Sequence, residues 1–176
     1  MLEVPSSFSL GGPISVAAWV KSSAPKNWER IIDFGDDSEA KADNIILSRV
    51  ETGTALLWEI RANGTRYALQ QEGFFDHEEG MWTHVAASVE GSTMKVFKNG
   101  VLFAIKHDGA EPRREHRVNQ YIGQSNNAVA GDENFAGEMR QVAFYNGALP
   151  DEHWAQMVNA SKPDPTQSPT PSPTAS

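Results

Sequence analysis

Two neighbouring apolar runs lie near the middle of the chain, Met81-Trp82-Thr83-His84-Val85-Ala86-Ala87-Ser88-Val89 and Thr93-Met94-Lys95-Val96-Phe97-Lys98-Asn99-Gly100. Each has the length and the β-branched and aromatic content that are typical of a strand. The second run ends at Asn99-Gly100, and both residues tolerate the positive φ that a type I′ turn requires. We therefore expect Val101 to Ile105 to pair back on the second run, which predicts an antiparallel all-β domain.

Further short apolar runs, separated by turn residues, lie on both sides of this region. They are Ile14 to Val20, Ile31 to Phe34, Asn44 to Val50, Ala55 to Arg61, Thr65 to Gln70, Gln120 to Gly123 and Phe135 to Tyr145. Asn63-Gly64 is a second hairpin signal. The polar and acidic run from Gln71 to Gly80 is expected to be a surface loop.

Alternation within two of these runs predicts which side chains share a face of the sheet. One group joins Leu56, Trp58 and Ile60, opposite Leu57, Glu59 and Arg61. The other joins Phe135, Met139 and Tyr145, opposite Val142 and Phe144.

One segment near the C-terminus has helical spacing. Trp154, Met157 and Val158 follow Leu149-Pro150 at positions i, i+3 and i+4, and Asp151 provides acid in the first turn. We expect a short helix that packs its apolar stripe on the sandwich. Residues 162–176 are rich in Pro, Ser and Thr, a composition typical of an extended spacer. The predicted organisation is one folded domain over residues 1–161 and a disordered linker over residues 162–176.

Composition excludes several classes of function. The chain has 176 residues, a net charge of −8 and no cysteine. An acidic domain is a poor ligand for nucleic acid, and the absence of thiols excludes disulfides and cysteine chemistry. No stretch is long and apolar enough to insert into a membrane, and the N-terminus lacks a signal peptide. We interpret the chain as part of a longer secreted or cell-surface protein, because of the linker.

Six collinear pieces of this sequence resemble the laminin-G-like, concanavalin A-like jelly-roll family. They are Ile14 to Val20, Arg30 to Asp36, Trp82 to Ala86, Phe97 to Gly100, Tyr121 to Ser125, and Phe135 to Leu149. The resemblance implies a two-sheet antiparallel sandwich of about six or seven strands in each sheet, stacked face to face. The final Ala-Leu and the short acidic helix also look like the end of a domain of this family.

Five residues are candidates for carbohydrate binding. Trp58 is a candidate for the concave face, where an aromatic ring can stack on a sugar ring, although buried packing is the usual fate of such a residue. Arg61, Tyr67, Asn126 and Asn127 are candidate polar contacts from the same groove or from the loop rim.

A calcium site is expected among the acidic loops, at Asp33, Asp36, Asp132 and Glu133. Calcium prefers six to eight oxygen ligands from carboxylates, amides and carbonyls. Relatives of this kind often bind calcium at a loop rim. However, many carry an acid shortly after the glycine of the last strand, where this chain has Met139-Arg140.

The sequence argues against catalysis. A jelly-roll glycoside hydrolase needs two carboxylates on one strand face, whereas Glu59 has Arg61 as its same-face neighbour and Glu138 has Arg140. His84 lacks a partner base in the sequence and is expected to be a structural histidine.

We therefore predict a non-catalytic extracellular recognition module that binds carbohydrate. The alternatives are a calcium-assisted protein-binding adhesion domain and, less favoured, a glycoside hydrolase. The partner is then a glycan or an extracellular protein. Two glycosylation sequons begin at Asn63 and Asn159 and carry no weight without knowledge of the source.

Overall fold

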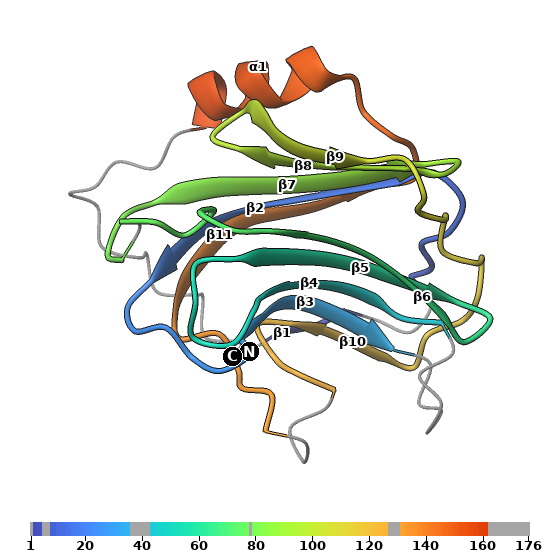
Figure 1. The fold of residues 1–176 in the computed structure, drawn as a ribbon, viewed down its shortest axis with the longest axis horizontal. Coiled ribbons are helices and arrows are strands. Elements are labelled where there is room, and N and C mark those ends of the chain that lie inside the picture. Colours follow the sequence, from blue (N-terminus) through green and yellow to red (C-terminus); the bar gives the residue numbers. More distant parts are fainter. Residues whose placement is uncertain (1, 5–7, 36–42, 78, 127–130, 162–176) are drawn as a thin grey trace, which may run out of the picture.

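The protein is a sandwich of two antiparallel sheets, shown by a computed structural model that describes residues 2–4, 8–35, 43–77, 79–126 and 131–161 (Figure 1). The six-stranded sheet has the order β1 (Leu2–Glu3), β10 (Asn119–Ile122), β3 (Arg30–Gly35), β4 (Ile45–Arg49), β5 (Leu56–Ala62) and β6 (Thr65–Gln71). The five-stranded sheet has the order β11 (Gly137–Tyr145), β2 (Ile14–Ser22), β7 (Thr83–Glu90), β8 (Thr93–Lys98) and β9 (Val101–Lys106).

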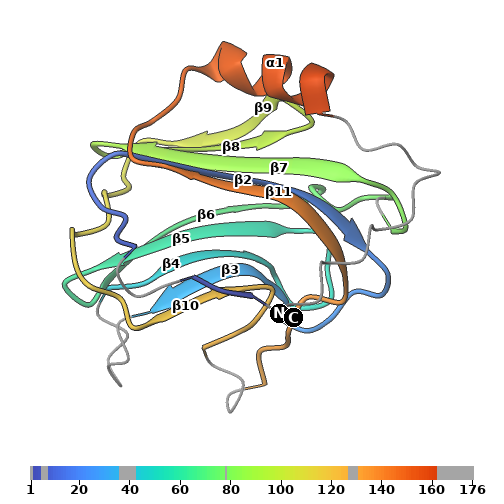
Figure 2. The same ribbon diagram turned by 180° about the vertical axis from the view of Figure 1, so that it is seen from behind.

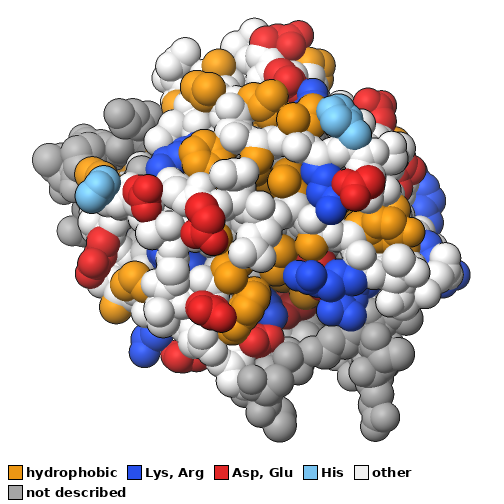
Figure 3. Space-filling view, in the orientation of Figure 1, with side chains coloured by type: hydrophobic (Ala, Val, Ile, Leu, Met, Phe, Trp, Pro, Cys, Tyr) orange, Lys and Arg blue, Asp and Glu red, His pale blue; other side chains and the backbone are white. Residues whose placement is uncertain are grey.

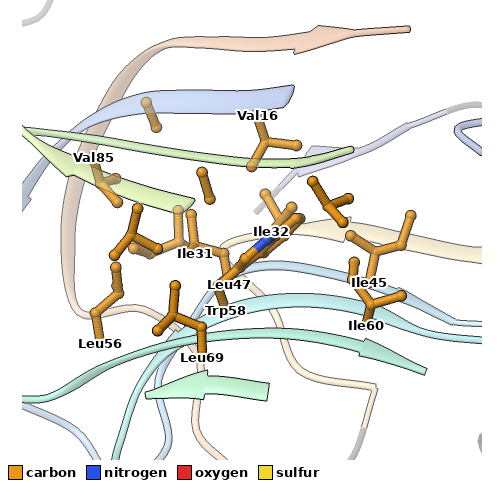
Figure 4. Packing of buried hydrophobic residues seen from close by; sticks show 14 of the residues in the cluster. Val16, Ile31, Ile32, Ile45, Leu47, Leu56, Trp58, Ile60, Leu69 and Val85 are labelled. Carbon is orange, nitrogen blue, oxygen red and sulfur yellow. The ribbon is translucent and has the colours of Figure 1, made fainter. Parts of the chain in front are cut away.

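The core lies between the two sheets, where alternate residues of each strand meet (Figure 4). Trp58 on β5 is at its centre and is 0% exposed, and its indole Nε1 donates to the carbonyl of Ser88 on β7 at 3.2 Å. This hydrogen bond joins the two sheets and satisfies the only polar atom of the ring. Leu56 and Ile60 lie on the same inner face, which confirms the predicted alternation of this strand.

Both predicted hairpins are confirmed. Asn63 and Gly64 have φ values of 51° and 75° between paired Ala62 and Thr65, and Asn99 and Gly100 have 50° and 82°. These are the positive values of a type I′ turn, which twists in the same sense as the strands that it joins. A Cβ at Gly100 would lie 2.8 Å from the Cα of Ala155, so this glycine also permits close approach of the helix.

The predicted helix is α1 (Asp151–Ser161), and it lies on the side of the five-stranded sheet that faces away from the other sheet (Figures 1 and 2). Its Trp154 is 0% exposed and packs with Ala17, Ala86 and Phe97. The indole Nε1 of Trp19 donates to the Ser161 hydroxyl at 3.1 Å, so the last turn is also attached. The helix therefore gives this sheet a second, smaller apolar cluster.

Three expectations about local structure need correction. The polar run after β6 is not wholly a surface loop, because Phe74 and Phe75 in it are 0% and 6% exposed. In β11 the pairing with β2 shifts between Arg140 and Ala143, and Gln141 has a φ of 50°. This bulge inserts an extra residue, so Met139 and Val142 both pack against the main core instead of on opposite faces.

The five-stranded sheet also has fewer strands than the resemblance implied. After β9, residues 107–118 return to the other sheet without joining a ladder. Arg117, 1% exposed, holds this connection by donating to the carbonyls of Leu10, Asp43 and Arg113 at 2.8–3.0 Å. No helix of the described residues has the length and apolar character needed to span a membrane.

His84 is a structural histidine, as predicted. Its ring is 1% exposed and lies 5.3 Å from the ring of Trp19 and 6.3 Å from that of Trp154. Within the described part of the chain its Nδ1 has no hydrogen-bond partner. Burial disfavours the imidazolium form and lowers the pKa of His84 from 6.5 to about 4.

This burial predicts a pH dependence of stability. Above pH 6.5 both states are neutral at this residue and its full contribution is present. As the pH falls from 6.5 towards 4, His84 becomes protonated in the unfolded chain but stays neutral in the folded chain. The free energy of unfolding therefore falls by about 3 kcal/mol over this range. Urea unfolding at several pH values measures this slope. It should be flatter in His84→Gln and unchanged in His107→Gln, whose ring is exposed. An equal slope in His84→Gln and wild type would contradict the assignment.

Candidate functional site

A hollow of about 220 Å³ lies on the outer face of the six-stranded sheet, the face turned away from the other sheet. Alternation along β5 directs Leu57, Glu59 and Arg61 to this face, because Leu56, Trp58 and Ile60 occupy the core. The hollow is lined by Trp28, Arg30, Ile46, Leu57, Glu59, Arg61, Arg66 and Asp132. It combines an aromatic ring, two aliphatic side chains and five charged groups, so it is more polar than the mostly apolar pockets of drug-sized ligands.

One wall of the hollow is built around Arg30, at the start of β3. Residues three apart in a regular strand point to opposite faces, but the pairing of β3 with β4 shifts between Arg30 and Ile32. Arg30 therefore lies beside Asp33, and its Nε donates to the Asp33 carboxylate at 3.2 Å. A terminal nitrogen of Arg30 donates to the Asp132 carboxylate, which comes from a distant loop. Two carboxylates thus neutralise this guanidinium.

The opposite wall is built by the β5–β6 hairpin. Arg61 and Arg66 are directly opposite each other in its register. Glu59, 3% exposed, lies between them, and its two oxygens accept from the Nε atoms of Arg61 at 2.7 Å and Arg66 at 2.6 Å. Like charges at opposed positions destabilise a hairpin, so this one carboxylate compensates two cations.

Trp28 forms the aromatic side of the hollow and is partly exposed. Its backbone has a φ of 51°, which costs a bulky residue about 1–3 kcal/mol. Contacts on both sides hold it there, since its N–H donates to the carbonyl of Glu51 at 3.2 Å and its carbonyl accepts from Arg30 at 2.8 Å. A strained residue that is fixed in this way points to a functional constraint on the position of its ring.

The floor of the hollow is aliphatic. Ile46 and Leu57 lie on the outer face of the sheet, yet they are only 6% and 3% exposed. The charged side chains around them provide this cover, with their stems along the sheet and their heads towards water. Little of this floor is therefore exposed, and the partly exposed Trp28 is the residue of this lining that can offer an apolar surface to a ligand.

The predicted sugar-binding residues do not all reach this hollow. Arg61 lines it. Trp58 is the wrong aromatic residue, because it belongs to the face of β5 that packs in the core and has no exposed surface. Tyr67 also packs against the core, from the inner face of β6.

Asn126 has a structural position. Its backbone N–H donates to the Asp33 carboxylate at 3.0 Å, and its side-chain amide donates to Asp33 and to the carbonyl of Asn119 at 3.0–3.1 Å. These bonds tie the loop after β10 to β3. Asn127 lies outside the described residues.

The described acidic residues do not form a cage for calcium. Asp33 and Asp132 share the Arg30 guanidinium, and Glu133 pairs with Lys26 at 3.5 Å. In the described ranges no three His, Asp or Glu side chains gather closely enough to hold a metal ion. Asp36 lies outside those ranges, so the calcium site stays a prediction.

Sequence reasoning missed Trp28, Arg30 and Arg66. One signal was available for Trp28, which is a lone aromatic residue in the polar stretch 21–30, just after Pro25. The position of Arg30 depends on a bulge that no alternation rule predicts.

A second hollow, of about 360 Å³, lies on the outer face of the five-stranded sheet, lined by Ser88, Glu90, Thr93, Lys95 and residues 148–151. It is larger, but none of the described residues that line it is aromatic, and Lys95 forms an ion pair with Asp151 at 2.7 Å. We therefore take the hollow beside Trp28 as the candidate site.

Comparison with known proteins agrees with this architecture. The family model for the concanavalin A-like lectin/glucanases superfamily matches residues 2–153. The chain belongs to this superfamily. No curated protein matches its sequence significantly.

Solved structures similar to this fold include the CBM40 of the Ruminococcus gnavus IT-sialidase bound to α2,3-sialyllactose, with a TM-score of 0.71, 16% identity, and coverage of 85% of this chain and 83% of that one. Another is domain 4 of AbnA, a GH43 extracellular arabinanase from Geobacillus stearothermophilus, in complex with arabinotriose. Its TM-score is 0.67 and its sequence identity is 20%, and the match covers 89% of this chain and 71% of that one. Domains LG4-5 of the mouse laminin α1 chain match with a TM-score of 0.59 and 12% identity, covering 80% of this chain and 37% of that one. At these identities the likeness establishes the fold.

The role of Glu59 between the two arginines is testable by stability. Glu59→Gln is expected to lower the free energy of unfolding by about 1–2 kcal/mol, because Arg61 and Arg66 then oppose each other without a counter-charge. Urea unfolding measures the change. The control is Glu72→Gln, an exposed carboxylate after β6, for which a change under about 0.5 kcal/mol is expected. Equal effects of both substitutions would contradict the bridging role.

Proposed function

We propose that this domain is a non-catalytic carbohydrate-binding module, and that the hollow beside Trp28 holds the sugar. The observation that carries the proposal is the partly exposed Trp28, fixed through its backbone in a hollow that it shares with charged hydrogen-bonding groups. A sugar ring has an apolar face of C–H groups and an equator of hydroxyls, so it needs this combination of surfaces. The sugar-bound structures with the same fold support the proposal by analogy.

The same geometry argues against a glycosidase. Hydrolysis needs one carboxyl that presents a proton to the leaving-group oxygen and a second that attacks or activates water. In this hollow Glu59 accepts from two arginines and Asp132 accepts from Arg30. These carboxylates hold the walls of the site and are not presented to a ligand. The proposed module would act within a longer secreted or cell-surface chain, attached through residues 162–176.

A protein-binding adhesion role is the second candidate. It has one observation in its favour, the three apolar side chains exposed on the edge strand β9, where Val101 is 69%, Leu102 42% and Ile105 44% exposed. Paired strands do not cover this edge, which makes it open to another polypeptide. A glycan array without any signal would favour this protein-binding role over carbohydrate binding.

The first test is a glycan array with the purified domain, followed by titration of the best ligand against Trp28→Ala. We expect the substitution to weaken binding at least about tenfold, because a ring that covers the sugar is lost. The matched control is Val101→Ala, an exposed apolar residue of the other sheet, which should bind as wild type does. Equal binding by Trp28→Ala and wild type would place the sugar elsewhere and overturn the proposal.

Calcium forms a separate arm of this test. The hollow presents its own charged groups, so binding through it is expected to be the same in calcium and in chelator. Loss of binding in chelator would show that a metal completes the site, as the acidic loops around Asp36 predict. The melting temperature gives an independent measure, because calcium bound only to the folded state must raise it.

A further inference from the structure

The β5–β6 wall of the hollow carries more positive charge than its own carboxylate neutralises. Arg61 and Arg66 oppose each other in register and share Glu59 alone. Only their Nε atoms are used in these contacts. Among the described residues, the terminal nitrogens of both guanidinium groups have no acceptor. An arrangement that costs stability and leaves several strong donors open is suited to an anionic ligand.

Exposure accentuates this charge. The Glu59 side chain is 4% exposed, whereas those of Arg61 and Arg66 are 27% and 48% exposed. A ligand in the hollow therefore meets the guanidinium groups and not the carboxylate. This contrasts with the chain as a whole, whose net charge is −8, and with the face shown in Figure 3, where acidic, basic and hydrophobic side chains are interspersed.

The other cation of the hollow lacks this excess. Arg30 donates to both Asp33 and Asp132, so two carboxylates already surround it. The site is therefore asymmetric, with two carboxylates against one cation at Arg30 and a donor-rich wall at Arg61 and Arg66. Between them lies the floor of Ile46 and Leu57.

We propose that the hollow selects glycans whose terminal sugar carries a carboxylate, with the acid group at Arg61 and Arg66 and the apolar face of the ring on Trp28. Planar guanidinium groups match a carboxylate through paired hydrogen bonds. The volume of about 220 Å³ is below the range of about 300–1,000 Å³ usual for drug-sized ligands, so the site takes one ring. This inference rests on the proposed function and adds its substrate class.

The test compares acidic sugars with neutral counterparts of the same shape. The probes are α2,3-sialyllactose and digalacturonic acid, the methyl ester of each, lactose, and 3′-sulfated lactose, titrated by calorimetry at low and moderate salt. At least one free acid is expected to bind, and its methyl ester at least about tenfold more weakly, since the ester loses the charge. Salt should weaken binding of the acid, because the arginines are partly exposed.

Two variants assign the effect to the wall. Arg66→Gln should lower the affinity for the acid at least about tenfold. It should leave the melting temperature close to that of wild type, because Glu59 keeps Arg61 as its partner. Lys106→Gln removes the same charge from β9 of the other sheet and should bind as wild type does. Equal binding of the acid by Arg66→Gln and wild type would overturn the inference.

The two proposals fail in different ways. Binding of neutral glycans alone, abolished in Trp28→Ala and unaffected in Arg66→Gln, would overturn the acidic selectivity and leave the proposed function standing. Binding of the sulfated probe without any carboxylated one would also overturn it. If no glycan of any kind binds, both proposals fall.

Discussion

Arginine–carboxylate pairs on the outer face of the six-stranded sheet are the constraint on which the site depends. A sheet in a two-layer sandwich has one face in the core and one towards water. Here the outer face carries Ile46 and Leu57, and none of the helices and strands that the structure describes forms a third layer over them. The chain shields them with the pairs centred on Arg30 and Glu59, which stand around them as walls. The walls leave the hollow between them, so covering the sheet and forming the site have one physical cause.

Apolar side chains on the two outer faces of the sandwich are covered in different ways. On the five-stranded sheet, α1 covers the apolar side chains, and Trp154 fills the space above Ala17 and Ala86. The helix buries His84 beneath it, and this burial lowers the pKa of His84 to about 4. On the six-stranded sheet, charged side chains give partial cover. The hollow with an aromatic wall therefore lies on the outer face of the six-stranded sheet. The helix lies on the opposite side of the molecule, against the outer face of the five-stranded sheet (Figures 1 and 2).

Local sequence rules predicted most of the fold and little of the site. Alternation, the Asn-Gly pairs and the helical spacing of Trp154 depend on neighbours in the chain, and the structure confirms them. The bulges in β3 and β11 depend on cross-strand pairing, which a single strand does not encode. The bulge in β3 aligns Arg30 with Asp33. Because the bulge was not predicted, the wall of the hollow around Arg30 was not predicted either.

The aromatic residue of the site shows the same limit from another side. Trp58 was a candidate because aromatic rings stack on sugar rings, but it lies on the inner face of β5 and is a core residue. Trp28 lies in an irregular segment, and its position is set by backbone contacts with Glu51 and Arg30. Arg61 lines the hollow because strand alternation places it on the outer face of β5. The sequence thus predicted the positions that depend on strand alternation and missed those that depend on long-range contacts.

The most direct measurement is a ¹H–¹⁵N NMR titration of the domain with the glycan that binds best on an array. The account predicts that the largest shifts occur at the indole N–H of Trp28 and the Nε–H groups of Arg61 and Arg66, which line one hollow. Shifts confined to β9 or to the helix-covered face, with these three signals unchanged, would contradict it.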